Sequence, residues 1–358
     1  MAAGTIISAH HPFVKTVAAA LRRECGVRSK ARILIALSGG ADSVALLRTL
    51  VALSPRRGWK LNLAVGHVQH HLRELVSKDR VVPDEENPSS PSEADALFSQ
   101  RLAEHHHLPF FRRDLDLTDP RGQTNVEAQA RQARYEALHE MSQSFQGDFV
   151  ATAHHGDDQL ETLLMRLLRG SSVHGLAGMP WQRPLLAESS IRLIRPLLDQ
   201  DRSAVIDFLQ ALDQPWREDH TNADITRLRA RLRQHLVPVL HEIRSDVAQK
   251  TTALTQHMSQ LRSLLTDAGK QAAERVAKQR CHGQIVIPRP QSRELPDIVL
   301  MELLRNILIE AGASPDTLGQ RALGPIVRAI RDTRGGSRTF HLSGGAVMTI
   351  TRNEVRIA

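Results

Sequence analysis

Short apolar runs and amphipathic segments follow one another along the N-terminal part of the chain. Compact apolar runs bounded by glycine or polar residues are typical of buried strands. The expected strands are 31–37, 61–68, one within 108–117, and 148–155. The expected helices are 14–23, 42–53, 94–106, 125–143 and 156–170, the last closed by Gly170. Alternating strands and helices predict an α/β fold in which helices cover both faces of an open parallel sheet.

The pattern changes after residue 210, where polar helices replace the strand-like runs. The expected elements are an Arg-rich helix at 225–241, a long polar helix at 247–280, a helix at 294–312, and a β-hairpin or small sheet with a Gly-Gly turn at 337–358. The expected domains are an α/β domain over 1–220, a connecting helix over 221–245 and a smaller α+β domain over 246–358.

Residues 73–93 interrupt the α/β pattern of the first domain. Their sequence, RELVSKDRVVPDEENPSSPSE, is rich in Pro, Ser and acidic residues. Such a composition can bury little apolar surface, so we expect a mobile insertion at the surface of the domain.

The composition points to an aliphatic core and an anionic partner. Hydrophobic residues make up 41% of the chain and aromatic residues only 3%. The net charge is +8, and only 7 of the 47 basic residues are Lys, which leaves 40 Arg. The planar guanidinium fork suits phosphate, so this balance favours nucleic acid as a partner. A GC-rich genome, which favours Arg codons, would account for the Arg bias equally well.

Cysteine usage and the N-terminus limit the class of protein. The two cysteines, Cys25 and Cys281, form no CxxC motif, which argues against a disulfide scaffold, a zinc ribbon and an iron–sulfur site. No apolar run approaches the roughly 20 residues of a membrane span. The N-terminus lacks the charged region of a secretory signal, so the expected compartment is the cytoplasm. The oligomeric state stays open, with a homodimer as one option.

The stretch ILIALSGGADSVALL at 33–47 has the order strand, glycine turn, helix, which is the order of a phosphate-binding loop. The lysine of a Walker A loop is missing. Gly39 and Gly40 allow backbone N–H groups to approach anionic oxygens, and the hydroxyls of Ser38 and Ser43 add donors. A carboxylate among phosphates makes sense if it holds a cation, so Asp42 predicts a Mg²⁺ site.

A second polar segment, TAHHGDDQLETLLMRLLRGS at 152–171, joins the end of a strand to a helix. Asp158 and Glu161 are three residues apart and share one helix face, where they could hold a cation or an ammonium group. His154 and His155 are expected to face a cleft. One alternative is a capped helix with solvated acids. Another is a zinc site made by His154, Asp158 and Glu161, although no further ligand cluster supports it.

Two helices place arginines at helical spacing. Arg131 and Arg134 share a face of the 125–143 helix and suit ATP phosphates or an RNA backbone. Arg229 and Arg233 lie one turn apart in the 225–241 segment. Arginines at alternate positions there would also suit one side of a strand. The apolar residues that favour a helix instead are Leu228, Leu232, Leu236 and Val239. Solvated helix charges are the plainer alternative for Arg131 and Arg134.

Together these segments resemble the tRNA(Ile)-lysidine synthetase family of the PP-loop ATP pyrophosphatase superfamily. The matching patterns are SGGxDS, TAHHxDDxxET, the NxExxAR..RY helix at 125–138 and the Arg-rich segment at 219–240. HVQHHLR resembles the family's HVNHGLR, with Gln69 and His71 as departures, and Ala230 stands where the family has Asn. The resemblance covers about residues 30–240 and continues more loosely over 245–358.

The resemblance implies a Rossmann-like adenine nucleotide alpha-hydrolase core and a C-terminal domain that binds tRNA. It implies that ATP with Mg²⁺ adenylates the C2 oxygen of the wobble cytidine in tRNA(Ile) with a CAU anticodon. Free L-lysine then displaces AMP to form lysidine, which changes codon reading from AUG to AUA.

The resemblance also implies roles for individual residues. The implied catalytic residues are Asp42, His154, Asp158 and Glu161, of which Asp158 and Glu161 hold lysine and Asp42 holds Mg²⁺. The implied ATP-binding residues are Ser38, Gly39, Gly40, Ala41, Asp42, Ser43, Arg131 and Arg134. Arg229 and Arg233 are implied contacts to ATP phosphate or tRNA.

Three rival functions remain open at this point. A tRNA thiolation enzyme on the same scaffold usually needs cysteines, of which this chain has two, far apart in sequence. A small-molecule synthetase of the superfamily would not need an Arg-rich second domain. An RNA-binding protein with a vestigial nucleotide site would be expected to lose Asp42, Asp158 or Glu161.

Overall fold

The computed structural model describes residues 10–70, 91–115, 126–217, 228–276, 279–281, 284–334 and 336–358. Residues 73–90 of the expected insertion lie outside these ranges, as do His71 and the start of the Arg-rich segment, 219–227. The chain divides into two compact units. The first comprises Met1–Thr162 and Met179–Thr252, and the second comprises Leu163–Gly178 and Ala253–Ala358. The expected connecting segment, 221–245, falls within the first unit over its described residues.

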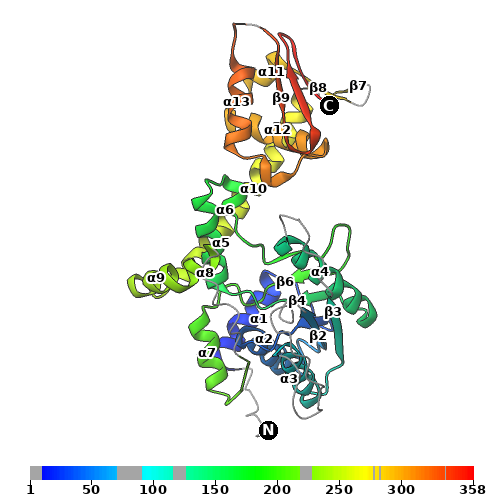
Figure 1. Cartoon of the computed structure of the whole chain (residues 1–358), viewed down its shortest axis with the longest axis vertical. Helices are drawn as coiled ribbons and strands as arrows, with labels where there is room; N and C mark the ends of the chain where they lie inside the picture. The colour runs from blue at the N-terminus through cyan, green and yellow to red at the C-terminus, as the bar shows by residue number, and fades with distance from the viewer. Residues whose placement is uncertain are drawn as a thin grey trace, which may run out of the picture. The chain divides into compact units, whose positions relative to one another are not determined.

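A six-stranded sheet of order β3-β2-β1-β4-β6-β5 forms the centre of the first unit (Figure 1). Its strands are β1 (Arg32–Ala36), β2 (Asn62–His70), β3 (Phe110–Leu115), β4 (Phe149–Ala151), β5 (Gln182–Pro184) and β6 (Arg192–Ile194). All neighbours pair in parallel except β5, which runs antiparallel to β6 at one edge. The predicted open parallel α/β sheet is therefore confirmed, with one antiparallel edge strand that the sequence pattern did not indicate.

Helices cover both faces of this sheet. They are α1 (Pro12–Arg23), α2 (Ala41–Leu53), α3 (Pro91–His105), α4 (Val126–Phe145) and α7 (Arg202–Gln210). The first unit also contains the start of α5 (Gly156–Leu168), which continues into the second unit, and α8 (Leu228–Arg231) and α9 (Val237–Ile243), with a π-helical turn, η3 (Leu232–Leu236), between these last two. Successive residues of a strand point to opposite faces. Ile33 and Ile35 therefore join a core with residues of α1, α2 and α7, whereas Leu34 joins a second core with residues of α4.

The order of the strands creates a position where loops diverge. The chain proceeds from β1 outward to β2 and β3, and then returns to place β4 on the other side of β1. Because β1 and β4 are parallel neighbours, the loops that leave them diverge above the sheet at its carboxyl edge. Such a switch point is where open α/β sheets bind ligands. Both segments expected to carry chemistry, 38–43 and 152–161, begin there.

The second unit contains a five-stranded antiparallel sheet of order β7-β8-β11-β10-β9. Its strands are β7 (Gln279–Cys281), β8 (Gln284–Pro288), β9 (Arg338–His341), β10 (Val347–Ile350) and β11 (Glu354–Ile357). Its helices are α6 (Val173–Leu176), α11 (Arg289–Glu294), α12 (Asp297–Glu310) and α13 (Gln320–Arg331), with short 3₁₀ turns η4 (Pro315–Thr317) and η5 (Ser343–Gly345). The long helix α10 (Val247–Arg275) contains the division between the units.

The small C-terminal sheet and its glycine turn were predicted, and both are present. Gly344 and Gly345 have φ of +81° each, in the connection from β9 to β10. The pairing of β8 with β11, and helix α13, were not predicted. Ile287 lies opposite Val355, 68 positions further along the sequence, a pairing that local patterns do not reveal. None of the helices in the described ranges is long and apolar enough to cross a lipid bilayer.

Arg289 closes the C-terminal end of α13. Its side chain is 2% exposed, and it donates to the carbonyl oxygens of Ala329 (2.7 Å), Ile330 (3.1 Å) and Thr351 (2.7 Å). The last carbonyls of a helix have no partner inside the helix, so a buried guanidinium that satisfies several of them stabilises this end.

We expect Arg289→Met to lower the free energy of unfolding of the second unit by about 3 kcal/mol, because it leaves several buried carbonyls without donors. Urea unfolding followed by circular dichroism measures the loss. Arg328→Met, which removes an exposed arginine from the same helix, is the matched control and should change stability by less than about 0.5 kcal/mol. Equal effects of the two substitutions would show that Arg289 does not act through the helix end.

Candidate active site

The loop between β1 and α2 has the geometry of an anion cradle. Gly39 has φ of +88°, which turns the chain sharply before α2 begins at Ala41. Gly40 is the N-cap and provides no side-chain cap, so the first N–H groups of α2 face outward from the helix end without a capping side chain. The hydroxyl of Ser43 donates to Gly40 O at 2.9 Å and accepts from Ser38 N at 3.3 Å. These two hydrogen bonds of Ser43 hold the ends of the loop together.

Two neighbouring segments hold the loop from outside. Nδ1 of the buried His67, on β2, donates to Leu37 O at 2.8 Å. Burial lowers the pKa of His67, although the bond to Leu37 acts to raise it. The backbone N–H of Arg217 donates to Gly39 O at 2.9 Å, and its guanidinium pairs with Asp95 on α3 at 2.9 Å. Neither His67 nor Arg217 was singled out from sequence.

Asp42 lies in the first turn of α2 with one oxygen paired and one not. Oδ2 accepts from the guanidinium of Arg202 at 3.2 Å and lies 3.7 Å from Nε2 of His155. Oδ1 is buried and makes no hydrogen bond within the described residues. A buried carboxylate oxygen without a donor is a ready ligand for a hard cation, so the residues present fit the expected Mg²⁺.

The acidic start of α5 lies beside Asp42. The side chains of Asp157, Asp158 and Glu161 are 8%, 12% and 1% exposed, so this is not a solvated helix cap. Oδ2 of Asp158 accepts from the backbone N–H of His155 at 3.0 Å. The His155 ring lies 3.6 to 3.7 Å from Asp42, Asp157 and Asp158 and so connects α2 with α5.

Arg229 and Arg233 pair with these acids. Arg229 donates to Glu161 at 2.7 Å and to Asp158 at 2.9 Å, and Arg233 donates to the same two residues at 2.6 and 3.0 Å. The expected helix here is confirmed, since α8, η3 and α9 are continuous and one turn aligns the two arginines. Burial works to raise the pKa of Asp158, but His155, His154 and Arg229 outweigh it and hold this pKa below its usual range.

The apolar residues of the same segment do not pack as one stripe. Leu232 is buried, whereas Leu228, Leu236 and Val239 are each more than a third exposed. The π-helical turn η3 changes the angular spacing after Leu232, so residues that would share a face of a regular α-helix are rotated apart. The leucines thus indicated a helix correctly, but they do not indicate its buried face.

Burial keeps His154 neutral. Nδ1 lies 3.0 Å from the hydroxyl of Thr152, and burial lowers the pKa of His154 to about 3 although Asp158 acts to raise it. At neutral pH the ring is therefore uncharged and can exchange hydrogen bonds with a substrate. Nε2 makes no hydrogen bond within the described residues and is the nitrogen left for a substrate.

The other two expected ATP contacts lie on α4. The guanidinium of Arg131 lies near Tyr135, 3.4 Å from its hydroxyl and 5.6 Å from the ring centre. Its charge also lowers the pKa of His154. Arg134 is exposed on the same helix. The structure thus connects Arg131 with His154, and the charge of Arg131 also acts on Arg134.

Two residues of this site were not identified from sequence. The backbone N–H of Arg202, at the start of α7, donates to Asp157 at 2.8 Å, while its guanidinium reaches Asp42. His241 on α9 lies 2.5 Å from the other oxygen of Asp157. Burial acts to lower the pKa of His241, but Asp157 reverses this and raises it. No signal for either residue is present in the sequence, because Arg202 is 45 residues and His241 is 84 residues away from Asp157.

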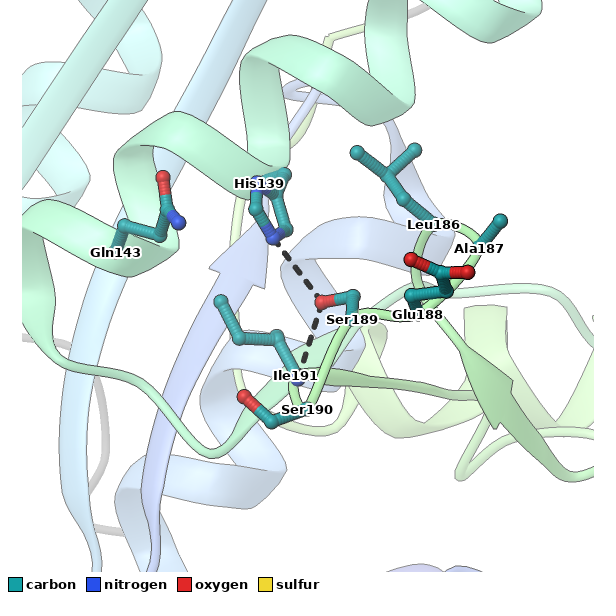
Figure 2. Close-up of a pocket in the computed structure, with 8 residues that line it drawn as sticks. All are labelled: His139, Gln143, Leu186, Ala187, Glu188, Ser189, Ser190 and Ile191. Atoms are coloured by element: carbon teal, nitrogen blue, oxygen red, sulfur yellow. Dashed lines mark hydrogen bonds between the residues drawn. The ribbon is translucent and has the colours of Figure 1, made fainter.

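A separate cavity lies at the turn between β5 and β6. Its volume is about 310 Å³, and Figure 2 shows His139 hydrogen bonded to Ser189 at 3.0 Å on its wall. Ser189 also accepts from the backbone N–H of Ile191 at 3.1 Å. None of the expected site residues lines this cavity. The glycine loop and the buried carboxylates therefore indicate the position of the active site, and this cavity does not.

A glycine loop at the switch point of a parallel sheet, with a carboxylate beside it, defines an ATP-binding α/β protein of the PP-loop class. The PP-loop domain family matches residues 10–240. A tRNA(Ile)-lysidine synthase from Nostoc sp. is 32% identical over 84% of this chain and 78% of its own length. That of Thermosynechococcus vestitus is 31% identical over 88% and 82%. The chain belongs to the tRNA(Ile)-lysidine synthase family, as its motifs predicted.

Other relatives with the same name are longer than this chain. The chain covers 41% of the Solibacter usitatus protein, to which it is 40% identical over 212 residues. Among solved structures, the U34-tRNA thiolase NcsA from Methanococcus maripaludis, described with its 4Fe-4S cluster, has a TM-score of 0.53 and 17% identity, covering 69% of this chain and 77% of that chain. At this identity the likeness concerns the fold alone.

We expect Gly39→Ala to lower the free energy of unfolding by about 1–2 kcal/mol, because an L-residue with a side chain is strained at φ of +88°. The new Cβ would also lie 3.4 Å from Cγ of Arg217. Gly40→Ala is the control, since its φ is −71° and the added Cβ would lie 3.7 Å from its nearest neighbour, Ser38 Oγ. Urea unfolding without ligand compares the two, and equal losses would contradict the assignment of strain to Gly39.

Proposed function

We propose that this chain ligates lysine to the C2 position of the wobble cytidine of tRNA(Ile) with a CAU anticodon, using ATP. The observation that carries this proposal is the contact of the loop carboxylate Asp42 with the His155–Asp158 segment, which brings an ATP-type loop and a buried acid pair into one site. The cytidine is then activated at the loop, and the amine attacks from the neighbouring acid pair, Asp158 and Glu161.

The first step is adenylation of the cytidine. The C2 oxygen of cytidine attacks the α-phosphate of ATP, pyrophosphate leaves, and the oxygen becomes part of a good leaving group. Ser38, Gly39, Gly40, Ala41 and Ser43 bind the phosphates through hydroxyl and backbone N–H donors. Asp42 would hold Mg²⁺ through its unpaired oxygen, and the ion would offset charge on the departing pyrophosphate.

The second step is attack by the amine of free lysine at C2, with loss of AMP. Asp158 and Glu161 attract the ammonium group, and the uncharged ring of His154 beside them can hydrogen bond to the substrate. A carboxylate of this pair takes the proton that the amine loses as it attacks. Both acids form ion pairs with Arg229 and Arg233, whose side chains are 41% and 38% exposed. Lysine binding therefore requires these guanidinium groups to share or give up the carboxylates, and an anionic substrate such as ATP or tRNA offers them replacement partners.

The rival thiolation chemistry finds little support in the described cysteine. Cys25 is buried, and burial raises the pKa of its thiol to about 12. A thiol protonated at neutral pH and closed to solvent is a poor sulfur carrier. The zinc site considered for His154, Asp158 and Glu161 finds no support either, since in the described part of the chain no group of three or more His, Cys, Asp or Glu is placed to hold a metal ion.

Incorporation of labelled lysine into a tRNA(Ile)(CAU) transcript, in the presence of ATP and Mg²⁺, tests the proposed function. We expect label in this transcript and none in tRNA(Met), which carries the same anticodon. Pyrophosphate is measured in the same reactions. Pyrophosphate release with tRNA but no incorporated label would retain the adenylation step and overturn lysine as the nucleophile.

We expect Glu161→Gln to raise the apparent KM for lysine about tenfold while pyrophosphate release with tRNA stays within about threefold, because a charged hydrogen bond contributes on the order of 1.5–3 kcal/mol. Glutamine keeps the size of the side chain, which limits disruption of the buried site. Glu140→Gln, an exposed acid on α4, is the control. An unchanged KM for lysine, or a failure of adenylation, would overturn the role of Glu161 in holding lysine.

A further inference from the structure

Three arginines from different elements gather around the buried ring of Tyr135. Arg131 comes from α4, Arg183 from β5, and Arg195 follows directly after β6. The guanidinium carbons of Arg183 and Arg131 lie 4.7 and 5.6 Å from the centre of the ring. Burial raises the pKa of the phenol, but the charges of Arg131, Arg195 and Arg183 outweigh it and lower this pKa, so all three arginines act on one group.

The positive charge of this cluster is not compensated by acids. In the described part of the chain, Arg183 donates to the carbonyls of Pro184 and Leu185, and Arg195 donates to the carbonyl of Pro180 at 2.6 Å. Both also hydrogen bond to the side chain of Tyr135, and neither pairs with a carboxylate among these described residues. Arg195 is 1% exposed, and its buried Nε makes no hydrogen bond within the described residues. Burial lowers the pKa of Arg195 only to about 10, so the group is still charged at neutral pH.

The contrast with Arg229 and Arg233 is informative. Those two guanidinium groups neutralise two carboxylates, whereas the three around Tyr135 repel one another in a partly buried setting. Like charges brought together at low dielectric destabilise the fold unless an anion joins them. A cluster of this kind therefore indicates a ligand of negative charge rather than a structural ion pair.

The cluster borders the active site. Ala151 and Ile194 are register partners in the parallel strands β4 and β6, so the residues that follow them, up to His154 and Arg195, leave the sheet at the same edge. The charges of Arg195 and Arg131 both lower the pKa of His154. An anion held by these arginines would thus lie near the nitrogen that faces the substrate.

Resting on the proposed function, we propose that Arg131, Arg183 and Arg195 form a subsite for a backbone phosphate of the RNA next to the cytidine that is modified. Planar guanidinium groups match phosphate oxygens in pairs, and they carry no base specificity of their own. The triphosphate of ATP already has the loop at Ser38–Ser43. Arg229 and Arg233 already pair with the acids of α5, whereas these three arginines have no carboxylate partner in the described residues. A flanking phosphate held by them would fix the base against His154.

Arg183→Gln tests the subsite through binding of tRNA(Ile)(CAU) transcript without ATP, measured by fluorescence anisotropy at several salt concentrations. We expect the Kd for tRNA to rise roughly three- to tenfold and the slope of log Kd against log salt to fall by about 0.7–1, as for the loss of one phosphate contact. The Kd for ATP should stay within twofold. Arg101→Gln, an exposed arginine on α3, removes the same charge and should change neither value.

A second variant keeps the test valid if Arg183→Gln fails to fold. Arg131→Gln removes an exposed side chain whose contact is with Tyr135, and it should raise the Kd for tRNA in the same way. A rise in the Kd for ATP with unchanged tRNA binding would assign the cluster to the triphosphate and overturn the RNA subsite. Unchanged Kd values for both ligands would leave the arginines a packing role only. Wild-type protein that binds tRNA through Arg183 but incorporates no lysine would overturn the proposed function and leave the subsite standing.

Discussion

The burial of three carboxylates at the start of α5 is the constraint on which the active site depends. Charges removed from water need partners, and the loss of one partner from a buried pair typically costs 3–5 kcal/mol. Asp157 accepts hydrogen bonds from the N–H of Arg202 and the ring of His241. Asp158 and Glu161 form ion pairs with Arg229 and Arg233. The start of α7 and the whole segment from α8 to α9 are therefore positioned by the acids of α5.

Two electrostatic settings meet at His154. On one side the charges of Asp158 and Glu161 are neutralised by Arg229 and Arg233. A substrate cation can replace an arginine there, and a substrate anion can replace an acid. On the other side Arg131, Arg183 and Arg195 carry charge without a carboxylate partner in the described residues. The imidazole between them is uncharged because burial lowers its pKa. An uncharged ring between a cation site and an anion site repels neither substrate of a reaction that joins an amine to a polynucleotide.

The strand order explains why segments far apart in sequence can cooperate. The loop at 38–43 and the segment at 152–161 leave adjacent parallel strands, β1 and β4, at the point where the chain reverses its direction across the sheet. Their separation in sequence allows each to be read as a separate motif. Only the pairing of Ile33 with Phe149 and of Ile35 with Ala151 brings Asp42 within reach of His155.

The sequence by itself determined most of the elements, though not β5 or α13, and the chemistry that lies within one element. The glycine loop, the shared face of Asp158 and Glu161, the α/β alternation and the C-terminal glycine turn all follow from local spacing, which a single strand or helix imposes. Tertiary structure alone decided that His155 contacts Asp42, that Arg229 and Arg233 pair with the acids of α5, and that β8 pairs with β11. It also decided the buried face of the Arg-rich helix, since the π-helical turn changed the spacing that the leucines indicated. These outcomes depend on contacts between residues tens of positions apart, for which the local periodicity of a chain holds no signal.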